Sequence, residues 1–299
     1  MEKVGKMIVI KLQGGLGNQM FQYAFARILA EKNEVPVKLD TRFFCITKKE
    51  PGFTPRNFEL AIFNNSYSIA SESEIFSLCS RSILKTIVKK FGFKNSKIYN
   101  EPNLDFQSEA LSIKAPIYLN GFFQSYKYLL GFENIVREFF SFPVHELDAI
   151  NKKILDKIHN TTSISIHVRR GDYVSDEFTQ KYHGNCSLEY YMKAISLLAS
   201  KNIDFTLFIF SDDSDWVKKQ FKDLPYLKIF IDHNNGMDSW KDMLLMSYCS
   251  HHIIANSSFS WWAAWLNYNP QKIVVSPKKW YANTQLSTND LIPPQWIRI

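Results

Sequence analysis

The stretch Met7-Ile-Val-Ile-Lys-Leu-Gln-Gly-Gly-Leu-Gly-Asn18 gives the clearest indication of the fold. Met7–Leu12 is short and mostly apolar, which is typical of a buried strand, and the glycines after it predict a tight turn. Val35–Asp40 is predicted as the next strand. Between the turn and that strand, apolar residues recur at helical spacing, namely Met20, Phe21, Ala24, Phe25, Ile28 and Leu29. A strand, a glycine turn, a helix and a second strand imply parallel pairing in an α/β fold.

The second half of the chain repeats this alternation of helix and strand. Helices are predicted at Leu147–His159, Leu188–Ser200, Asp213–Phe221, Met237–Cys249 and Ser258–Leu266. The strands that follow them are predicted at Ser163–Val168, Phe205–Phe210, Lys228–Ile231, His252–Ala255 and Lys272–Val275. This order predicts a doubly wound α/β domain, in which ligands bind beyond the carboxyl ends of the strands.

The middle region, Thr41–Phe142, is less regular. It offers a capping box at Ser71–Glu74 and a short strand at Ile117–Asn120. We therefore expect two domains, residues 1–145 and residues 146–299, with the boundary near Phe142–Asp148.

Composition narrows the class of protein. The chain has 299 residues, is 45% hydrophobic and carries a net charge of +7. Its pI of about 9.0 suits an anionic partner: nucleic acid, an anionic membrane surface or a phosphorylated substrate. The four cysteines are scattered, which we interpret as reduced thiols of a cytoplasmic protein. Because neither a signal peptide nor an apolar run of about 18 residues is found, we expect a soluble or membrane-peripheral protein.

The most informative polar cluster is His167-Val-Arg-Arg-Gly-Asp-Tyr173, at the end of a predicted strand. An arginine fork binds phosphate or carboxylate through paired hydrogen bonds, and arginine is rarely buried without a partner. Alternation places His167 and Arg169 on one side and Arg170 on the other. One of the two arginines can then reach a ligand while the other holds the loop, most simply by pairing with Asp172. A purely structural Arg–Asp ion pair is the alternative.

Two further polar clusters follow predicted strands. Ser211-Asp-Asp-Ser-Asp215 suits helix capping, a carboxylate that accepts from a base or sugar, or, through its DxD pattern, a metal. Asn256-Ser-Ser-Phe-Ser260 opens a helix, and hydroxyls with free backbone N–H groups there form an anion site, although an ordinary capped helix fits as well. We interpret Trp261, Trp262 and Trp265 as core rather than as a sugar platform.

The remaining candidates are weak. Gly14-Gly-Leu-Gly17 lacks a full dinucleotide-binding pattern. His183 with Cys186, and the pair His251-His252, lack the second half of a zinc site. The basic amphipathic segment Arg81–Lys94 fits a helix packed on one side and solvated on the other, or one lying on a membrane surface.

Taken together, four segments resemble the bacterial α-1,2-fucosyltransferases of glycosyltransferase family 11. They are GGLGNQMFQYA at Gly14–Ala24, HVRRGDYV at His167–Val174, FSDD at Phe210–Asp213 and NSSFSWWAAWL at Asn256–Leu266. The resemblance covers nearly the whole chain and implies two Rossmann-like domains of GT-B type facing a cleft, with residues 1–145 on the acceptor side and residues 146–299 binding the GDP-sugar.

The resemblance also implies a reaction: inverting transfer of L-fucose from GDP-β-L-fucose to the 2-hydroxyl of a terminal β-galactoside, with no metal and no cofactor. Arg169 would bind the donor's β-phosphate and Asp212 the guanine, with His167 beside them. Ser257, Ser258 and Ser260 would form the diphosphate-binding turn. Gly17 and Asn18 would approach the diphosphate and the fucose from the N-terminal domain.

The base that takes the acceptor's proton is less defined. Glu177 lies eight residues after Arg169, where some related fucosyltransferases carry a catalytic glutamate. Asp172 and Asp176 are alternatives, and a highly dissociative transition state needs little base assistance.

Two other functions are weighed against this one. The first is an α-1,6-fucosyltransferase, or a transferase of another GDP-sugar, with the same fold. The second is a non-catalytic basic module that binds RNA or an anionic membrane. We expect no nucleic-acid partner, because charge alone says little about function.

Overall fold

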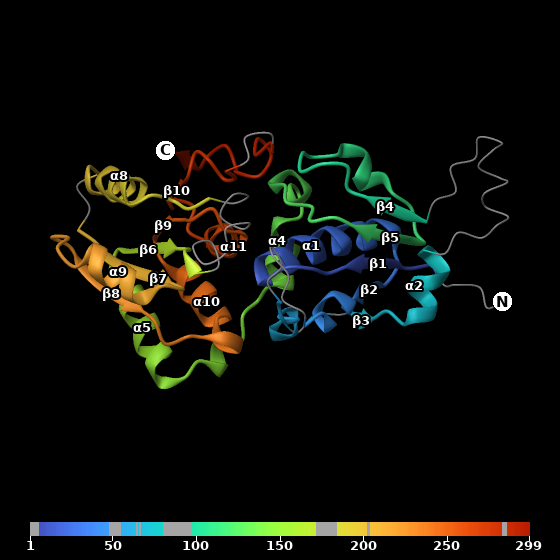
Figure 1. The fold of residues 1–299 in the computed structure, drawn as a ribbon, viewed down its shortest axis with the longest axis horizontal. Coiled ribbons are helices and arrows are strands. Elements are labelled where there is room, and N and C mark those ends of the chain that lie inside the picture. Colours follow the sequence, from blue (N-terminus) through green and yellow to red (C-terminus); the bar gives the residue numbers. More distant parts are fainter. Residues whose placement is uncertain are drawn as a thin grey trace. The chain divides into compact units, whose positions relative to one another are not determined.

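The computed structural model describes residues 6–47, 55–63, 65, 67–79, 97–171, 184–201, 204–282 and 286–299. These residues form two compact units. Unit 1 comprises the described residues up to Phe139 together with Asn289–Leu291, and unit 2 comprises Phe140–Thr288 and Ile292–Ile299. Each unit is built on one parallel sheet with helices packed against it (Figure 1). The prediction of two Rossmann-like α/β domains is confirmed.

The described part of unit 1 holds a five-stranded sheet of order β3-β2-β1-β5-β4, in which every pair is parallel. Its strands are β1 (Ile8–Lys11), β2 (Val37–Asp40), β3 (Ser68–Ile69), β4 (Ile98–Asn100) and β5 (Ile117–Asn120). Because β1 is the middle strand and apolar on both faces, it is buried almost completely, as its sequence predicts.

The helices of unit 1 cover this sheet. They are α1 (Leu16–Asn33), α2 (Glu72–Cys79) and α4 (Glu133–Phe139), with 3₁₀ turns η1 (Arg42–Cys45), η2 (Leu60–Ile62), η3 (Ser108–Ser112) and η4 (Tyr126–Leu129). Val9 of β1 packs with Ile75 and Leu78 of α2, so α2 covers one face. The predicted capping box is confirmed: Glu74 N donates to Ser71 Oγ at 3.2 Å, and Ser71 N donates to Glu74 Oε2 at 2.9 Å.

The described part of unit 2 holds a six-stranded parallel sheet of order β11-β10-β9-β6-β7-β8. The strands are β6 (Ser163–Val168), β7 (Thr206–Ser211), β8 (Leu227–Ile231), β9 (His251–Ile253), β10 (Val274–Ser276) and β11 (Ile297–Arg298). The helices are α5 (Ala149–His159), α8 (Leu188–Ala199), α9 (Ser214–Phe221), α10 (Trp240–Tyr248) and α11 (Ser258–Leu266), with 3₁₀ turns η5 (Val144–Glu146) and η6 (Gly236–Asp238).

The core of unit 2 shows which helices cover which face. Ile164, Ile166 and Val168 of β6 pack with buried residues of α8 and α9. Helix α10 instead contacts α5 and α11, as expected when connections wind around both faces of a sheet. Trp261 and Trp262 are fully buried, which confirms their interpretation as core.

The structure can be compared with the other predictions from the sequence. The short strands β3, β4 and β11 were not predicted, whereas every strand predicted in the second half is present within two residues of its expected ends. The segment Arg81–Lys94 lies outside the described residues. Cys45, Cys79, Cys186 and Cys249 are all free thiols. In the described part of the chain, no helix is both long and apolar enough to span a bilayer.

Candidate functional site

The sheet of unit 2 has a topological switch point between β6 and β9. From β6 the chain passes through α8 to β7 on one side, whereas from β9 it passes through α11 to β10 on the other. Ligands of doubly wound domains bind where the winding reverses, beyond the carboxyl ends of the strands. The two segments that flank this point are His167–Gly171 after β6 and Asn256–Ser260 after β9. These are two of the clusters that the sequence predicts as functional.

His167 connects the two segments. Its ring lies 5.7 Å from the ring of Phe259, centroid to centroid, so the end of β6 meets the start of α11. The side chain is buried, and its Nδ1 has no hydrogen-bond partner among the described residues. Burial lowers the pKa of His167 to about 4, so the imidazole is neutral near pH 7. A buried, neutral ring nitrogen without a partner suits a hydrogen bond with a ligand.

Arg169 and Asp212 form the ion pair at the ends of β6 and β7. Arg169 Nη1 lies 2.9 Å from Asp212 Oδ2, and both side chains are about one quarter exposed. The other carboxylate oxygen, Asp212 Oδ1, accepts from the backbone N–H of Arg170 at 2.8 Å. A Cβ atom at Gly171 would lie 2.8 Å from Asp212 Oδ2, so a side chain at this position would displace the carboxylate. Asp212 therefore orients the guanidinium of Arg169.

Arg170 has a different environment. Its Nε lies 3.2 Å from Asp213 Oδ2, and its guanidinium stacks 4.1 Å above the ring of Trp216. Asp213 also caps α9 by accepting from Trp216 N. In the described part of the chain, Arg170 is therefore held by Asp213 and Trp216. Asp172, the predicted partner, lies outside the described residues.

Asp213 and Asp215, the predicted DxD pattern, serve the start of α9. Asp213 is the N-cap, and Asp215 follows in the first helical turn. Among the described residues, no group of three or more His, Cys, Asp or Glu side chains is placed to hold a metal ion.

The serine-rich segment forms the N-terminus of α11. Ser257 is the N-cap and accepts from Phe259 N at 3.3 Å. Ser260 is buried, and its Oγ donates to the carbonyl of Ser257 at 3.4 Å. Ser258 is partly exposed. Asn256 donates to the carbonyls of Gly184 and Trp280, so this segment is held from both sides. The arrangement combines a fixed loop with the positive end of a helix dipole.

Unit 1 carries the other predicted binding residues. Gly17 is buried in the first turn of α1, and Asn18 beside it accepts at Oδ1 from Gln124 Nε2 at 2.7 Å. Gln124 follows β5, the neighbour of β1, so the pair lies beyond the carboxyl ends of adjacent strands. The backbone N–H of Leu16 donates to Glu59 Oε2 at 2.8 Å. A carboxylate therefore already satisfies one of the free N–H groups at the N-terminus of α1.

Sequence reasoning did not find the side chains that hold this glycine turn. Gln19 is fully buried: it donates to the carbonyls of Gly14 and Asn57 and accepts from the N–H groups of Glu59 and Leu60. Gln22 is equally buried and exchanges two hydrogen bonds with the backbone of Gln13. Both glutamines lie in the segment Gly14–Ala24. Their polar side chains within an apolar helix pattern were the signal that could have indicated this structural role.

Glu101 is a further carboxylate at this end of unit 1. Its oxygens accept from the backbone N–H groups of Phe122 and Phe123, at 2.7 to 3.1 Å. Burial raises its pKa. These contacts hold the loop after β5. The predicted base candidates Glu177, Asp172 and Asp176 lie outside the described residues.

Comparison with protein families adds independent information. The family model described as Glycosyl transferase family 11 matches residues 2–299. An alpha-1,2-colitosyltransferase of Escherichia coli is 35% identical, over 98% of this chain and 99% of its own length. The O-antigen biosynthesis glycosyltransferase WbnK of Escherichia coli is 34% identical, over 96% of this chain and 99% of its own. A galactoside 2-alpha-L-fucosyltransferase of Caenorhabditis elegans is 26% identical, over 60% of this chain and 51% of its own.

Solved structures give weaker likenesses. NodZ alpha-1,6-fucosyltransferase soaked with GDP-fucose matches with a TM-score of 0.48 and 13% identity, over 90% of this chain and 94% of its own. POFUT1 in complex with GDP matches with a TM-score of 0.47 and 12% identity, over 90% of this chain and 97% of its own.

Proposed function

The chain belongs to glycosyl transferase family 11, and from this premise we propose that it transfers L-fucose from GDP-β-L-fucose to the 2-hydroxyl of a terminal β-galactoside, with inversion of the anomeric centre. It would thus act as a galactoside 2-α-L-fucosyltransferase. In this proposal unit 2 binds the GDP-sugar and unit 1 serves the acceptor. The cytoplasm is the proposed location, with peripheral contact to a membrane.

The observation that carries the proposal is the cluster at the switch point of unit 2. Arg169, oriented by Asp212, and the N-terminus of α11 flank the place where a doubly wound domain binds its ligand. Both groups supply positive charge: one through a guanidinium and the other through backbone N–H groups. This is the charge that a nucleoside diphosphate requires.

The same groups account for the chemistry of transfer. When the bond between fucose and the β-phosphate breaks, negative charge builds up on GDP and positive charge on the sugar. Arg169 and the N–H groups at Ser257 and Ser258 then stabilise the departing diphosphate, so the proposed reaction needs no divalent cation. A guanidinium carries five N–H donors, enough to keep the contact with Asp212 while binding phosphate oxygens.

The other predicted site residues have assigned roles in this proposal. His167 offers to the donor its Nδ1, which has no partner among the described residues, and Ser260 fixes the first turn of α11 through its bond to Ser257. Gly17 and Asn18 are the proposed donor contacts from unit 1. Asp212 is proposed to meet guanine as well as Arg169. The acceptor's proton is proposed to pass to Glu177, with Asp172 as the alternative.

The names of the relatives suggest two different donor sugars. The 35% identical relative is named an alpha-1,2-colitosyltransferase, and colitose is L-fucose without its 3-hydroxyl. GDP-colitose is therefore the second candidate donor. A site that hydrogen-bonds the 3-hydroxyl discriminates strongly against the deoxy sugar, whereas a site that leaves it in solvent accepts both.

A donor panel tests the proposal. The protein is incubated with a β-galactoside and with GDP-fucose, GDP-colitose, GDP-mannose or UDP-galactose, and the transferred sugar is identified by mass spectrometry. The proposal predicts the fastest transfer from GDP-fucose and none from UDP-galactose. Faster transfer from GDP-colitose would replace the donor in the proposal, and no transfer from any GDP-sugar would refute it.

A further inference from the structure

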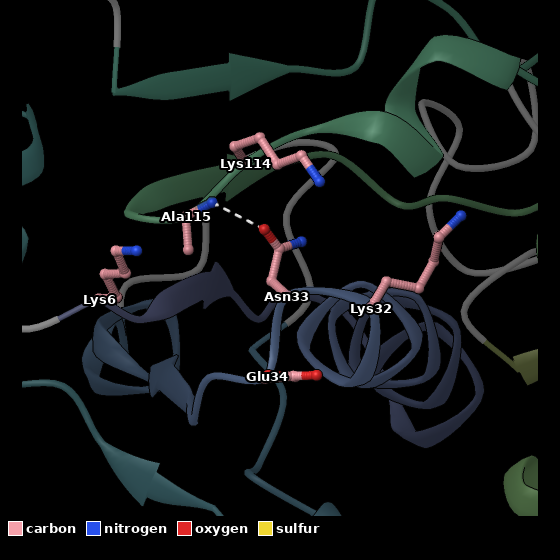
Figure 2. Close-up of a pocket in the computed structure, with 6 residues that line it drawn as sticks. All are labelled: Lys6, Lys32, Asn33, Glu34, Lys114 and Ala115. Atoms are coloured by element: carbon pink, nitrogen blue, oxygen red, sulfur yellow. Dashed lines mark hydrogen bonds between the residues drawn. The ribbon is translucent and has the colours of Figure 1, made fainter.

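A depression lined by three lysines lies in unit 1, at the edge of the sheet where the parallel strands begin. It has a volume of about 390 Å³ and is lined by Lys6, Lys32, Asn33, Glu34, Lys114 and Ala115 (Figure 2). Lys6 precedes β1 and Lys114 precedes β5, the neighbouring strand, whereas Lys32 lies in the last turn of α1. The glycine turn Gly14–Asn18 follows the other end of β1, so this depression is separate from the predicted binding residues of unit 1.

Asn33 holds the framework of this depression. Its Nδ2 donates to the carbonyl of Leu29 at 2.8 Å and to that of Ile113 at 3.0 Å, and its Oδ1 accepts from Ala115 N at 3.1 Å. These three bonds tie the end of α1 to the segment that leads into β5. The backbone of Lys32 and Lys114 is thereby fixed, and the two ammonium groups are presented from a rigid base.

The charges of the depression are unbalanced. Figure 2 shows the side chains of Lys6, Lys114 and Lys32 on different sides of Asn33. All three lysines are exposed, and none forms an ion pair with a residue in the described part of the chain. Glu34 is the acidic residue in the lining. Lys97 precedes β4, the neighbour of β5, and adds a further cation to the same edge.

The dipole of α1 explains only part of this arrangement. Carbonyls at the C-terminus of a helix attract cations, which accounts for Lys32 in the last turn. Lys6 and Lys114 come from segments before strands, so the dipole of α1 does not account for their place in this lining. Like charges repel, so three unpaired lysines around one concave surface are more stable with an anion among them.

We propose that the Lys6/Lys32/Lys114 depression binds a phosphate group. Lysine ammonium groups bind phosphate as compact point charges with three donors each. Free phosphate and the headgroup of an anionic phospholipid share this chemistry. The inference is independent of the proposed function, because all its residues belong to unit 1, whereas Arg169 and Asp212 belong to unit 2.

The test uses two probes on the full-length protein saturated with GDP, so that a donor site is already filled. Co-sedimentation measures binding to vesicles of phosphatidylglycerol with phosphatidylcholine, against vesicles of phosphatidylcholine alone. Calorimetry measures binding of inorganic phosphate. The test variant is Lys6→Gln/Lys32→Gln/Lys114→Gln. The matched control is Lys152→Gln/Lys153→Gln/Lys222→Gln, which removes the same three charges from exposed positions of unit 2.

We expect the test variant to lose at least about tenfold in affinity for one probe and the control to change by less than about twofold. Loss confined to the vesicles assigns a lipid headgroup, and loss confined to inorganic phosphate assigns the free ion. Equal losses in the two variants, or no binding of either probe by the wild type, would overturn the proposal. Should the test variant fail to fold, Lys114→Glu alone is expected to weaken the same binding and Lys114→Arg to preserve it.

Discussion

Arg169 is the residue on which the proposed chemistry depends. Its Nη1 lies 2.9 Å from Asp212 Oδ2, an orientation that the ion pair fixes before any ligand binds. Arg170, its neighbour in sequence, is held instead by Asp213 and Trp216. Two adjacent arginines thus have different partners, as strand alternation predicts.

Replacement of Arg169 tests this division. Arg169→Ala is expected to lower kcat/KM by about 10²–10³, since one preorganised donor to the leaving group is lost. Steady-state transfer kinetics measure the effect, with the exposed Arg298→Ala as the control for loss of a charge. The thermal unfolding midpoint should stay close to that of the wild type, and near-normal turnover would contradict the diphosphate assignment.

His167 predicts a dependence of stability on pH. Burial lowers its pKa from 6.5 to about 4 in the folded protein, so between these values the unfolded chain binds the proton and the folded chain does not. Protonation of His167 therefore has no effect on the free energy of unfolding above about pH 6.5. As the pH falls from 6.5 toward 4, it lowers this free energy by up to about 3 kcal/mol. Urea unfolding of wild type and His167→Gln from pH 7 to 4 should show the wild type losing more stability. Parallel pH profiles would contradict the buried neutral imidazole.

At the scale of elements, buried glutamines hold the turn that begins α1. Gln19 makes four hydrogen bonds and Gln22 makes two, and both side chains are fully buried. Gln19→Leu removes the acceptor for the N–H groups of Glu59 and Leu60 and is expected to cost about 3 kcal/mol, whereas Gln22→Leu is expected to cost about half of that. Urea unfolding compares the two, and equal losses would argue against this role of Gln19.

The start of α11 combines a cap with a proposed anion site, and two variants of Ser257 separate these roles. Ser257→Ala loses the acceptor for Phe259 N and should cost about 1 kcal/mol of stability. Ser257→Asp keeps a good cap but places a carboxylate where the diphosphate is proposed to bind. We expect it to retain stability and to weaken GDP binding at least about tenfold, by calorimetry. Unchanged GDP affinity in Ser257→Asp would place the anion elsewhere.

The elements also show how far sequence reasoning reaches. The strands β6, β7 and β8 were predicted within one residue of their observed ends. In β7 the buried residues Leu207–Phe210 form a continuous apolar run, as expected of a buried parallel strand. Strand β3, by contrast, has two residues, both exposed, and therefore no apolar pattern to detect.

Some residues of the candidate site could be predicted from the sequence and others could not. Arg169, Asp212 and Ser257 were predictable because each follows a recognisable strand, and parallel strands end at one edge of a sheet. The contacts of unit 1 were not predictable: Leu16 and Glu59 are 43 residues apart, and Asn18 and Gln124 are 106 apart. Such pairs depend on the course of intervening segments that carry no regular pattern.

At the scale of the whole molecule, two parallel α/β units have different roles in the proposal. Unit 2 brings the predicted donor residues to its switch point, and unit 1 carries Asn18 together with the three-lysine depression. The two proposed ligands, a nucleoside diphosphate and a phosphate group, are both anionic and suit the net charge of +7.

The measurement that tests the central claim most directly is the linkage of the product. The protein is incubated with GDP-fucose and lactose in the presence of EDTA, and the product is analysed by NMR. We expect a single trisaccharide with α-linked fucose on the 2-hydroxyl of galactose, formed at a rate that EDTA does not change. Fucose at any other hydroxyl, no transfer to a β-galactoside, or an absolute need for a divalent cation would contradict it.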